Sequence, residues 1–432
     1  MDKPRTKILI LIDNFLIGGR ETFIKSYLSA LSDKQEYSFG LMANRINESV
    51  LGSSFDYVHA MDKESPLLND WLSEGHLCIE EFKPDIVWVH HYQLLTAWLL
   101  SCYYQIPLMC TLHGSIKNQG KFKRIQDQLG LACILKYPSS ISTVSGEIKD
   151  QLMEIDGDRN SSLLVNAIRI KEHNQRNLNE KKSQKNVKQN KSYAFVLLTR
   201  QQKLDHLRVG IKLFCKLKKH FPGSRLTIHT GRNINERGGS SKQLISIVGR
   251  KWTLKTPAFL FNINSIEVKP LVDDVTSVLE KADVVLGMGR VMIEAIAYRK
   301  VALLVGYDHY VGVINDNNFM SLQHNNFSGR ESIQQAEESI VKNIDQFMLN
   351  QNSLERMFDE VDVENQVSNL ESEINDILKN KKTYIINVDT NVDQEVKALI
   401  NKAKQLKEIT IDDDLIKLKS SLIDYLAKIK SS

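Results

Sequence analysis

Two adjacent glycines, Gly18 and Gly19, are the first residues along the chain whose type and position suggest chemistry. They follow a strand-like apolar run at 7–12 and precede a stretch with helical spacing at 21–31. Glycine lets the backbone approach a ligand closely, and the amides of a helix N-terminus can bind an anion. A tight turn can require glycine for its geometry alone, so both interpretations stay open. The spacing is not G-x-G-x-x-G, which disfavours a dinucleotide-dependent hydride-transfer enzyme.

His113 is a second candidate. It closes an apolar run at 108–112 and precedes Gly114. Its imidazole is therefore expected at the carboxyl edge of a sheet, where α/β proteins bind their ligands. The ordinary interpretation of a single histidine is a core or surface residue, and the position of His113 favours a role in a site. His90 and His91 also end a strand-like run, and contact with an acceptor or a structural use are both open for them.

The scaffold that must position these residues is visible as short apolar runs that alternate with amphipathic stretches. This pattern is typical of a parallel sheet that is covered by helices on both faces. Helices are expected at 21–31, 94–104 and 146–154. The expected strands of the first half are 7–12, 38–42, 86–90, 108–112, 140–144 and 162–165.

The alternation restarts after a polar segment. Residues 171–191 are rich in Lys, Asn and Gln and cannot bury enough apolar surface to order themselves. A linker or mobile loop is favoured here over a basic anion-binding loop. A further helix is expected at 207–220. The expected strands of the second half are 193–198, 225–230, 265–268, 283–286 and 301–305.

The chain is therefore predicted to have an α/β fold with two Rossmann-like domains facing a cleft and a helical C-terminal extension. In the extension, residues 392–429 carry Leu and Ile at helical spacing, which favours packing or self-association over contact with a membrane surface. The predicted regions are a first Rossmann-like domain at 1–170, a polar linker or loop at 171–192, a second Rossmann-like domain at 193–345 and a helical segment at 346–432.

Length and composition agree with this division. The 432 residues exceed the roughly 250 to 300 at which a single core stops growing. A hydrophobic content of 42% with 25% charged residues is ordinary for a globular protein, and a net charge of +5 is too weak to indicate a nucleic-acid partner. The five cysteines have no zinc-site spacing and are expected to be reduced core residues.

No stretch of the sequence has the character of a signal peptide or of a spanning helix of about 20 apolar residues. We therefore expect a cytoplasmic protein, with peripheral attachment to the inner face of the membrane as an alternative.

An ordered set of segments resembles the GT-B glycosyltransferases of the family 4 type, also called glycosyl transferases group 1. The resemblance runs from about residue 7 to residue 313. Its segments are ILILIDNFLIGGRETFIKSYLSAL, FKPDIVWVHH, IPLMCTLHG, ISTVSGEIKDQL, LLVNAIRI, VLLTRQQK, FPGSRLTIHTG and ADVVLGMGRVMIEAIAYRKVALLVG.

The resemblance implies roles for individual residues. His113 would lie near the reacting sugar, and Arg200 would meet the donor diphosphate, for which a guanidinium fork is suited. Glu294 would accept hydrogen bonds from the ribose hydroxyls, since two carboxylate oxygens can hold a vicinal diol. The other donor-binding residues that it implies are Gly18, Gly19, Gly289, Arg290 and Gly312. Arg290 is expected to contact phosphate or, equally, to be a solvated residue at a helix start.

Two positions depart from the family pattern. The family lysine, five residues after the arginine, is replaced by Asp205, so Lys203 is its substitute. The first of two family glutamates, eight residues before Glu294, is replaced by Leu286. The donor pocket must therefore differ from that of relatives, and a catalytically silent member becomes an alternative.

The resemblance implies transfer of a sugar from a nucleoside-diphosphate sugar to a carbohydrate or lipid-linked hydroxyl acceptor. The reaction would retain anomeric configuration and need neither metal nor cofactor, with the acceptor on the first domain and the donor on the second. Family habit suggests surface polysaccharide or glycoconjugate assembly. Two alternatives remain: a non-catalytic partner or stabiliser of an active transferase, and a nucleotide-sugar epimerase. The C-terminal helices could also bind a protein partner or a second copy.

Overall fold

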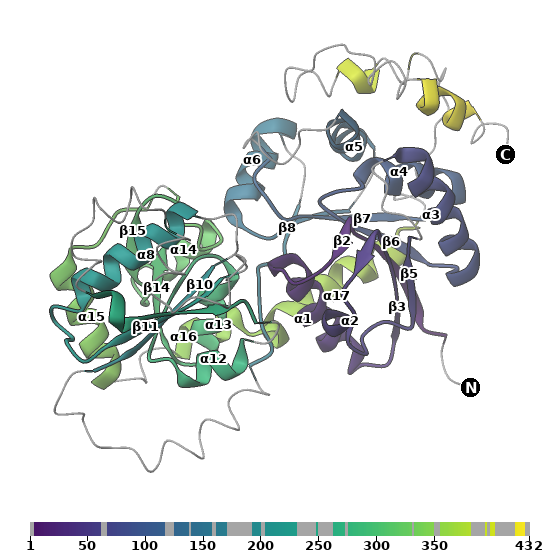
Figure 1. The fold of residues 1–432 in the computed structure, drawn as a ribbon. Coiled ribbons are helices and arrows are strands. Elements are labelled where there is room, and N and C mark those ends of the chain that lie inside the picture. Colours follow the sequence, from purple (N-terminus) through teal and green to yellow (C-terminus); the bar gives the residue numbers. More distant parts are fainter. Residues whose placement is uncertain are drawn as a thin grey trace, which may run out of the picture. The chain divides into compact units, whose positions relative to one another are not determined.

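The computed structural model describes most of the chain, and Figure 1 shows its elements. They form two compact units, which we call unit 1 (Met1–Val165 with Gln366–Ser432) and unit 2 (Asn166–Asn365). The sequence-based division instead set 346–432 apart as a segment of its own. The described residues are 4–61, 67–116, 125–137, 140–157, 161–170, 192–199, 204–230, 248, 262–272, 275–330, 332–349, 355–381, 394, 398–401 and 420–427.

In the described part of unit 1, seven strands form a parallel sheet, and β1 pairs with β3 on one side and with β6 on the other. Strands β3, β6 and β7 are buried along their whole length, as expected where helices cover both faces of a sheet. The order across the sheet is β5 (Tyr57–Ala60), β3 (Tyr37–Ala43), β1 (Thr6–Leu11), β6 (Ile86–His90), β7 (Leu108–Leu112), β8 (Ser140–Thr143) and β9 (Ser162–Leu163).

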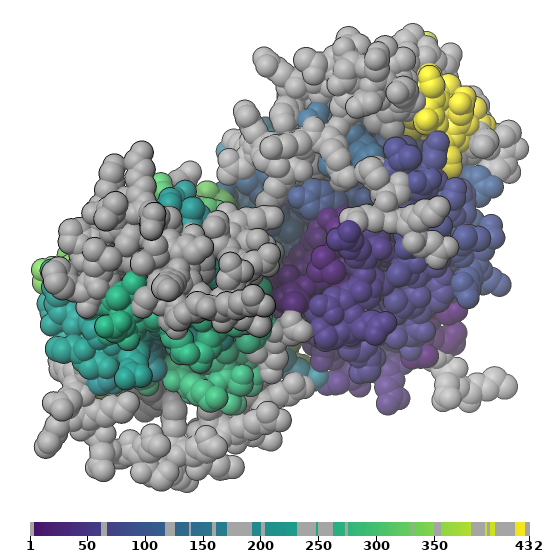
Figure 2. All heavy atoms as spheres, viewed as in Figure 1, coloured from purple at the N-terminus to yellow at the C-terminus, as the bar shows by residue number. Residues whose placement is uncertain are grey.

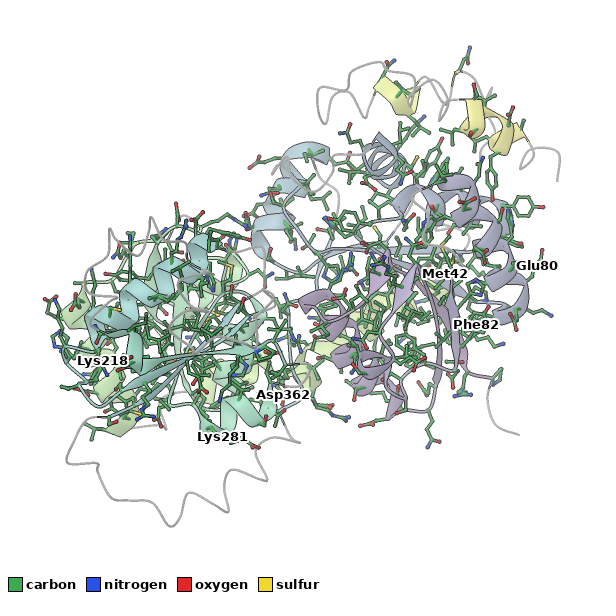
Figure 3. The ribbon with its side chains drawn as sticks, in the orientation of Figure 1. Met42, Glu80, Phe82, Lys218, Lys281 and Asp362 are labelled. Carbon is green, nitrogen blue, oxygen red and sulfur yellow. The ribbon has the colours of Figure 1, made fainter. Side chains whose placement is uncertain are left out.

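Helices connect these strands, and their apolar faces pack on the sheet. In the first helix, Phe23, Tyr27 and Leu31 recur every four residues and are fully buried. Phe82, labelled in Figure 3, ends the third helix. It lies against Gly40 of β3, where a Cβ would meet its ring at 3.0 Å. The helices are α1 (Gly19–Ser32), α2 (Glu48–Leu51), α3 (Leu68–Phe82), α4 (Leu94–Tyr104), α5 (Ile125–Lys136) and α6 (Gly146–Asp156), and a small separate pair is β2 (Asn14–Phe15) with β4 (Arg45–Ile46).

Unit 2 repeats this architecture. Its described strands are parallel except for the edge strand β15, which runs antiparallel to β14. The order across the sheet is β12 (Ile266–Pro270), β11 (Arg225–Thr230), β10 (Ala194–Thr199), β13 (Val284–Gly287), β14 (Val301–Val305) and β15 (Tyr310–Val313). Its helices are α8 (Leu204–Leu217), α12 (Thr276–Lys281), α13 (Arg290–Ala297), α14 (Phe319–His324), α15 (Glu337–Leu349) and α16 (Glu355–Val361), with a short 3-10 turn at Ile263–Ser265.

The predicted fold class of two Rossmann-like units is confirmed. Each strand expected from the sequence is found, with ends within two residues of the expected ones. The elements that the sequence did not indicate include β5, α3, α5 and β15. The five cysteines are free and buried, as expected.

The chain passes from unit 1 to unit 2 after Val165 and back to unit 1 after Asn365, and the segments of unit 2 next to these two points lie side by side. The Ile168 N–H donates to the Val361 carbonyl at 2.8 Å, and the Val363 N–H donates to the Ile168 carbonyl at 3.0 Å. Asp362, labelled in Figure 3, stands between these two bonds. The segment that returns to unit 1 is therefore hydrogen-bonded to the segment that leaves it.

The last long helix, α17 (Val363–Lys379), begins in unit 2 and continues into unit 1. There its buried Glu373 accepts hydrogen bonds from the Ser140 and Ser162 hydroxyls, the latter at 2.6 Å. Burial raises the pKa of this carboxyl, and the two serine bonds oppose the rise. Helix α17 thus completes the side of the sheet that carries β8 and β9.

Farther along the chain, residues 420–427 lie against α3 and α4 of unit 1, as the yellow atoms show in Figure 2. The Tyr425 hydroxyl is 3.1 Å from His76 Nε2, and His76 Nδ1 is 2.9 Å from the Tyr104 hydroxyl. Leu422 and Leu426, one helical turn apart, are fully buried. This part of the tail packs on the fold. Along the described residues no helix has the length and apolar content that crossing a membrane requires.

Replacing Glu373 with Gln is expected to raise the melting temperature at pH 7.5. Because the folded-state pKa of Glu373 is raised, its contribution is favourable at low pH and is lost as pH rises through that pKa. The neutral amide keeps the shape without the charge, which should be worth about 1 kcal/mol, or about 2–4 °C.

The measurement is calorimetry between pH 5 and 8. The Gln variant should lack the stabilisation that the native chain gains on acidification. The control is Glu371→Gln on the same helix, which removes an ion pair with Lys34 and should lower the melting temperature slightly. A lower melting temperature for the Glu373 variant at pH 7.5 would contradict the prediction.

Candidate functional site

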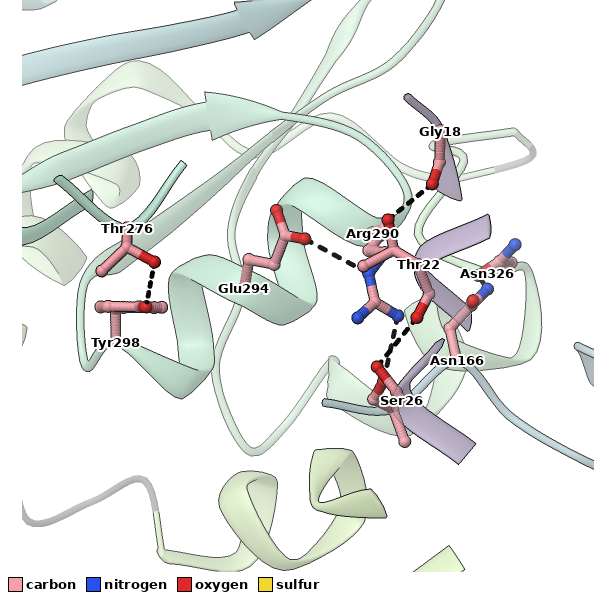
Figure 4. A network of polar contacts seen from close by, with 10 residues as sticks. Gly18, Thr22, Ser26, Asn166, Thr276, Arg290, Glu294, Tyr298 and Asn326 are labelled. Atoms are coloured by element: carbon pink, nitrogen blue, oxygen red, sulfur yellow. Dashed lines mark hydrogen bonds and ion pairs between the residues drawn. The ribbon is translucent and has the colours of Figure 1, made fainter. Parts of the chain in front are cut away.

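The glycine pair lies at the start of α1, at the carboxyl edge of the unit 1 sheet. Gly18 is the N-cap residue with a φ of −173°, an extended conformation that any residue adopts, and Gly19 begins the helix. Neither glycine has a positive φ. Turn geometry therefore does not explain Gly18. The Thr22 hydroxyl donates to the Gly18 carbonyl at 2.6 Å, as Figure 4 shows, while the backbone amide edge carries no capping side chain.

The residue after the pair, Arg20, was not singled out from the sequence. Its guanidinium forms ion pairs with Asp13 and Glu21, and it lies over the Tyr92 ring at 5.4 Å. Its side chain is only 16% exposed. Arg20 therefore places a held positive charge beside the N-terminus of α1.

Three histidines meet at the ends of β6 and β7. His90 Nδ1 is 2.8 Å from His113 Nε2, and the His113 backbone N–H donates to His91 Nδ1 at 3.3 Å. The Phe23 ring of α1 meets the His113 ring edge to face at 4.9 Å. The predicted candidates Gly18, Gly19 and His113 are thus brought to one edge of unit 1.

His90 is fully buried, and this burial determines which ring nitrogens of His90 and His113 carry a proton. Desolvation holds the pKa of His90 well below its ordinary value, and the nearby Arg20 charge lowers it further, so His90 is neutral. Within the described residues its Nε2 atom has no hydrogen-bond partner. A proton on Nε2 would be an unsatisfied buried donor, so hydrogen bonding favours the tautomer with the proton on Nδ1.

In this tautomer His90 donates to His113 Nε2, and His113 therefore carries its own proton on Nδ1. His113 can then orient a hydroxyl by donating a hydrogen bond, but it does not offer Nε2 as a base. His90 and His91, which the sequence left open, both have buried side chains that hold this arrangement.

The turn that carries these histidines has an uncommon backbone. His91 has a φ of 63°, and the Tyr92 N–H donates to the His90 carbonyl at 2.7 Å across it. Gln93 has the same φ. Left-handed residues other than glycine are uncommon and cluster at functional sites. The adjacent histidines in the sequence were the only visible signal of this turn.

In unit 2, β13 ends at Gly287 and α13 starts at Arg290, so the turn between them holds only Met288 and Gly289. Gly289 has a φ of 60°, which favours glycine, and its N–H donates to the Phe327 carbonyl at 2.8 Å. A Cβ on Gly287 would lie 2.5 Å from Val291. Both glycines therefore have a structural reason for being present.

Leu286 is a fully buried core residue of β13, opposite Leu197 of β10 and Leu303 of β14. The residue eight positions before Glu294 thus lies inside the strand and belongs to the core. A glutamate at this fully buried position would be an unpaired charge in the core, which accounts for the apolar residue.

Glu294 lies one helical turn after Arg290 on α13, as Figure 4 shows. Arg290 Nε donates to Glu294 Oε1 at 3.2 Å, and Arg290 Nη1 donates to the Ala167 carbonyl at 3.0 Å. The two side chains are 7% and 12% exposed. Arg290 is therefore not the solvated residue that the sequence left open, while its phosphate contact stays a prediction.

Gly312 lies apart from this group, on the edge strand β15. Its φ is 137°, and a Cβ would lie 2.3 Å from the Gln335 side chain, which hydrogen-bonds to Val313. This packing accounts for the glycine, and its predicted place over donor phosphates stays a prediction. Arg200 and Lys203 lie outside the described residues.

The comparisons with known proteins fit this geometry. Residues 41–168 match the sequence family Glycosyltransferase Family 4. The fold is shared with the Anabaena protein HepE (Alr3699), solved in complex with UDP and glucose: the TM-score is 0.57, the identity 12%, and the alignment covers 86% of this chain and 100% of that one. The chain therefore has the GT-B fold, and its residues 41–168 are similar to glycosyltransferase family 4.

Two other solved structures have the same GT-B fold. A candidate UDP-N-acetylglucosamine 2-epimerase from Listeria monocytogenes has a TM-score of 0.54 at 12% identity, over 89% of this chain and all of its own (100%). A glycosyltransferase from Rickettsia africae has a TM-score of 0.50 at 13% identity, over 94% and 100%. No curated protein sequence matches the chain. The family 4 match includes His90, His91 and His113 and ends before the α13 residues.

The structure predicts that His90 stays neutral at pH 6, where an ordinary histidine with a pKa of about 6.5 is mostly protonated. A histidine with a lowered folded-state pKa stabilises the fold above its unfolded pKa, and that stability is lost as pH falls toward the folded pKa. The expected loss is at most about 1.4 kcal/mol per pH unit below pH 6.5.

Histidine-selective NMR would read the charge state of His90, with the His90→Asn variant giving its assignment. That variant should also show a weaker acid dependence of stability than the native chain. His220→Gln on the surface of unit 2 should keep the native dependence. A His90 signal that titrates near pH 6.5 would refute the assignment.

Proposed function

We propose that this chain is a glycosyltransferase that moves a sugar from a nucleoside-diphosphate sugar to a hydroxyl acceptor. The observation that carries the proposal is the carboxylate of Glu294, which Arg290 holds on α13 just beyond the carboxyl end of β13. Ligands of open α/β sheets bind at this edge. The family 4 match and the UDP and glucose reported for the Anabaena neighbour support the choice of ligand class.

On the donor side, Glu294 accepts hydrogen bonds from the two ribose hydroxyls. The backbone at Gly289 allows the nucleotide to approach the start of α13. Arg200, with Lys203 beside it, pairs with the diphosphate and neutralises the charge that develops on the leaving group. Gly312 is assigned to the donor phosphates as well. Cationic side chains would serve without a metal, and the reaction would retain anomeric configuration.

On unit 1, His113 donates a hydrogen bond from Nδ1 to a hydroxyl of the transferred sugar and so orients its ring. The amide edge at Gly18 and Gly19 approaches the diphosphate. This unit also receives the acceptor, a carbohydrate or a lipid-linked saccharide. A place in surface polysaccharide or glycoconjugate assembly on the cytoplasmic side, with peripheral membrane attachment, belongs to the same proposal.

Two observations favour alternative functions, which should be tested together with the proposed sugar transfer. The buried Leu286 in place of a family glutamate fits a non-catalytic partner of an active transferase. The fold shared with the Listeria candidate epimerase fits isomerisation of a nucleotide sugar. A panel of UDP-, GDP- and ADP-sugars with product analysis separates them: transfer or slow donor hydrolysis supports the proposal, an isomerised donor supports an epimerase, and saturable binding without reaction supports a partner.

Nucleotide binding by unit 2 is the direct prediction. UDP, GDP and ADP are screened by thermal shift, and one of them should stabilise the chain by mass action. Glu294→Gln should weaken that nucleotide about tenfold to a hundredfold, because hydrogen bonds from the ribose to a charged acceptor are lost.

Glu337→Gln is the matched control, since this carboxylate on α15 pairs with His220, which follows the end of α8, away from the carboxyl edge of β13. It should leave nucleotide affinity unchanged. Absence of stabilisation by all three nucleotides, or equal affinity for native and Glu294 variants, would end the proposal as stated.

A further inference from the structure

Two hydrogen bonds join the Arg290 guanidinium to different parts of unit 2. Nε donates to the Glu294 carboxylate on the same helix, and Nη1 donates to the carbonyl of Ala167, 123 residues earlier in the chain. The side chain is 7% exposed. Figure 4 shows the guanidinium beside Glu294, with its other edge turned away from the axis of α13.

Ala167 belongs to the segment 166–170, where the chain has just left unit 1; we call it the crossover segment. Its neighbours are held as firmly. Asn166 Nδ2 donates to Asn326 Oδ1 at 2.8 Å, and the Ile168 N–H donates to the Val361 carbonyl at 2.8 Å. The contact with Arg290 is thus part of a continuous set of bonds that fixes this segment in unit 2.

The turn before α13 is hydrogen-bonded to the same loop that holds the crossover segment. Gly289 donates its N–H to the Phe327 carbonyl, and Asn326, which holds Asn166, is the residue before Phe327. Asn326 and Phe327 have φ values of 51° and 49°, two consecutive left-handed residues that are not glycine. Such backbone persists only where its surroundings determine it. The start of α13 and the crossover segment are therefore built against one loop.

We propose that Arg290 is a positioning residue that fixes the Glu294 carboxylate for the ribose hydroxyls and ties it to the crossover segment. This inference rests on the proposed function, because it assigns the ribose to Glu294. A carboxylate has about four acceptor positions, and the bond to Nε occupies one of them. A pairing cation is needed because an uncompensated carboxylate is costly at 12% exposure.

The two bonds require arginine. Nε and Nη1 lie on a rigid planar fork, so one side chain can hold a carboxylate and a carbonyl at fixed directions. A lysine ammonium keeps the charge but is a single point on a flexible stem. Lys at position 290 should therefore keep the ion pair with Glu294 and lose the bond to Ala167.

The first test compares UDP with 2′,3′-dideoxy-UDP, which lacks the ribose hydroxyls, by calorimetric titration. The native chain should prefer UDP by about tenfold or more. Arg290→Gln should lose most of this preference while its affinity for 2′,3′-dideoxy-UDP stays close to native. Glu294→Gln should show the same loss, and Arg290→Lys should keep part of the preference.

Arg299→Gln is the matched control. This arginine follows the same helix and stacks on the Phe358 ring at 4.2 Å. It should change stability and leave the ratio of the two affinities at its native value. A merely structural role for Arg290 would lower both affinities together, and an unchanged ratio in Arg290→Gln overturns the proposal. If Arg290 bound phosphate directly, Arg290→Gln would lower the affinities for both nucleotides by the same factor, which would also overturn the proposal.

A second test needs no nucleotide. In a double-mutant cycle, the stability effects of Arg290→Gln and Glu294→Gln should be non-additive, and amide exchange at residues 166–170 should accelerate in Arg290→Gln but not in Arg299→Gln. Additive effects and unchanged exchange overturn the positioning role. If the native chain binds neither these two nucleotides nor GDP and ADP, the ribose assignment fails together with the proposed function. The double-mutant cycle and the amide exchange still decide whether Arg290 ties α13 to the crossover segment.

Discussion

Parallel strand pairing is the constraint on which the rest of the structure depends. Because β1, β6 and β7 run in the same direction, their carboxyl ends and the turns that follow meet at one edge of the unit 1 sheet. Residues far apart in sequence, such as Gly18, His90 and His113, are thereby collected without any local signal between them. The same pairing of β10, β13 and β14 in unit 2 determines where α13 begins.

The sequence predicted what depends on local pattern. Apolar runs of five or six residues gave the central strands, and the strand-end position of His113 pointed to the edge of the sheet. Strand β5 was missed because its four residues alternate between partly buried and exposed, and β15 because it pairs antiparallel at the sheet edge. His113 meets His90 because of the register between two strands, and Arg290 meets Ala167, which lies 123 residues earlier in the chain. A local sequence pattern holds no information about such long-range contacts.

The site residues also show which features a family sequence pattern can predict and which it cannot. The pattern pointed to Glu294 and Gly289 as donor-binding residues, and the structure places Gly289 in the turn before α13 and Glu294 on that helix. It treated Leu286 as a lost functional group, whereas the structure gives it a place in the core that only an apolar side chain fills well. Counting positions identified the departure from the family pattern, and the burial of this residue in β13 explains why it is apolar.

Unit 1 is assembled from two distant stretches of the chain, and this has a consequence for biosynthesis. On the ribosome, its first 165 residues emerge before all of unit 2, and α17 and the stretch that carries Tyr425 emerge last. Until then Ser140 and Ser162 lack the carboxylate that joins them, and α3 and α4 lack their cover. A chain synthesised only as far as the end of unit 2 would therefore contain all of unit 2 and an incomplete unit 1, the state in which chaperones and proteases compete for nascent protein.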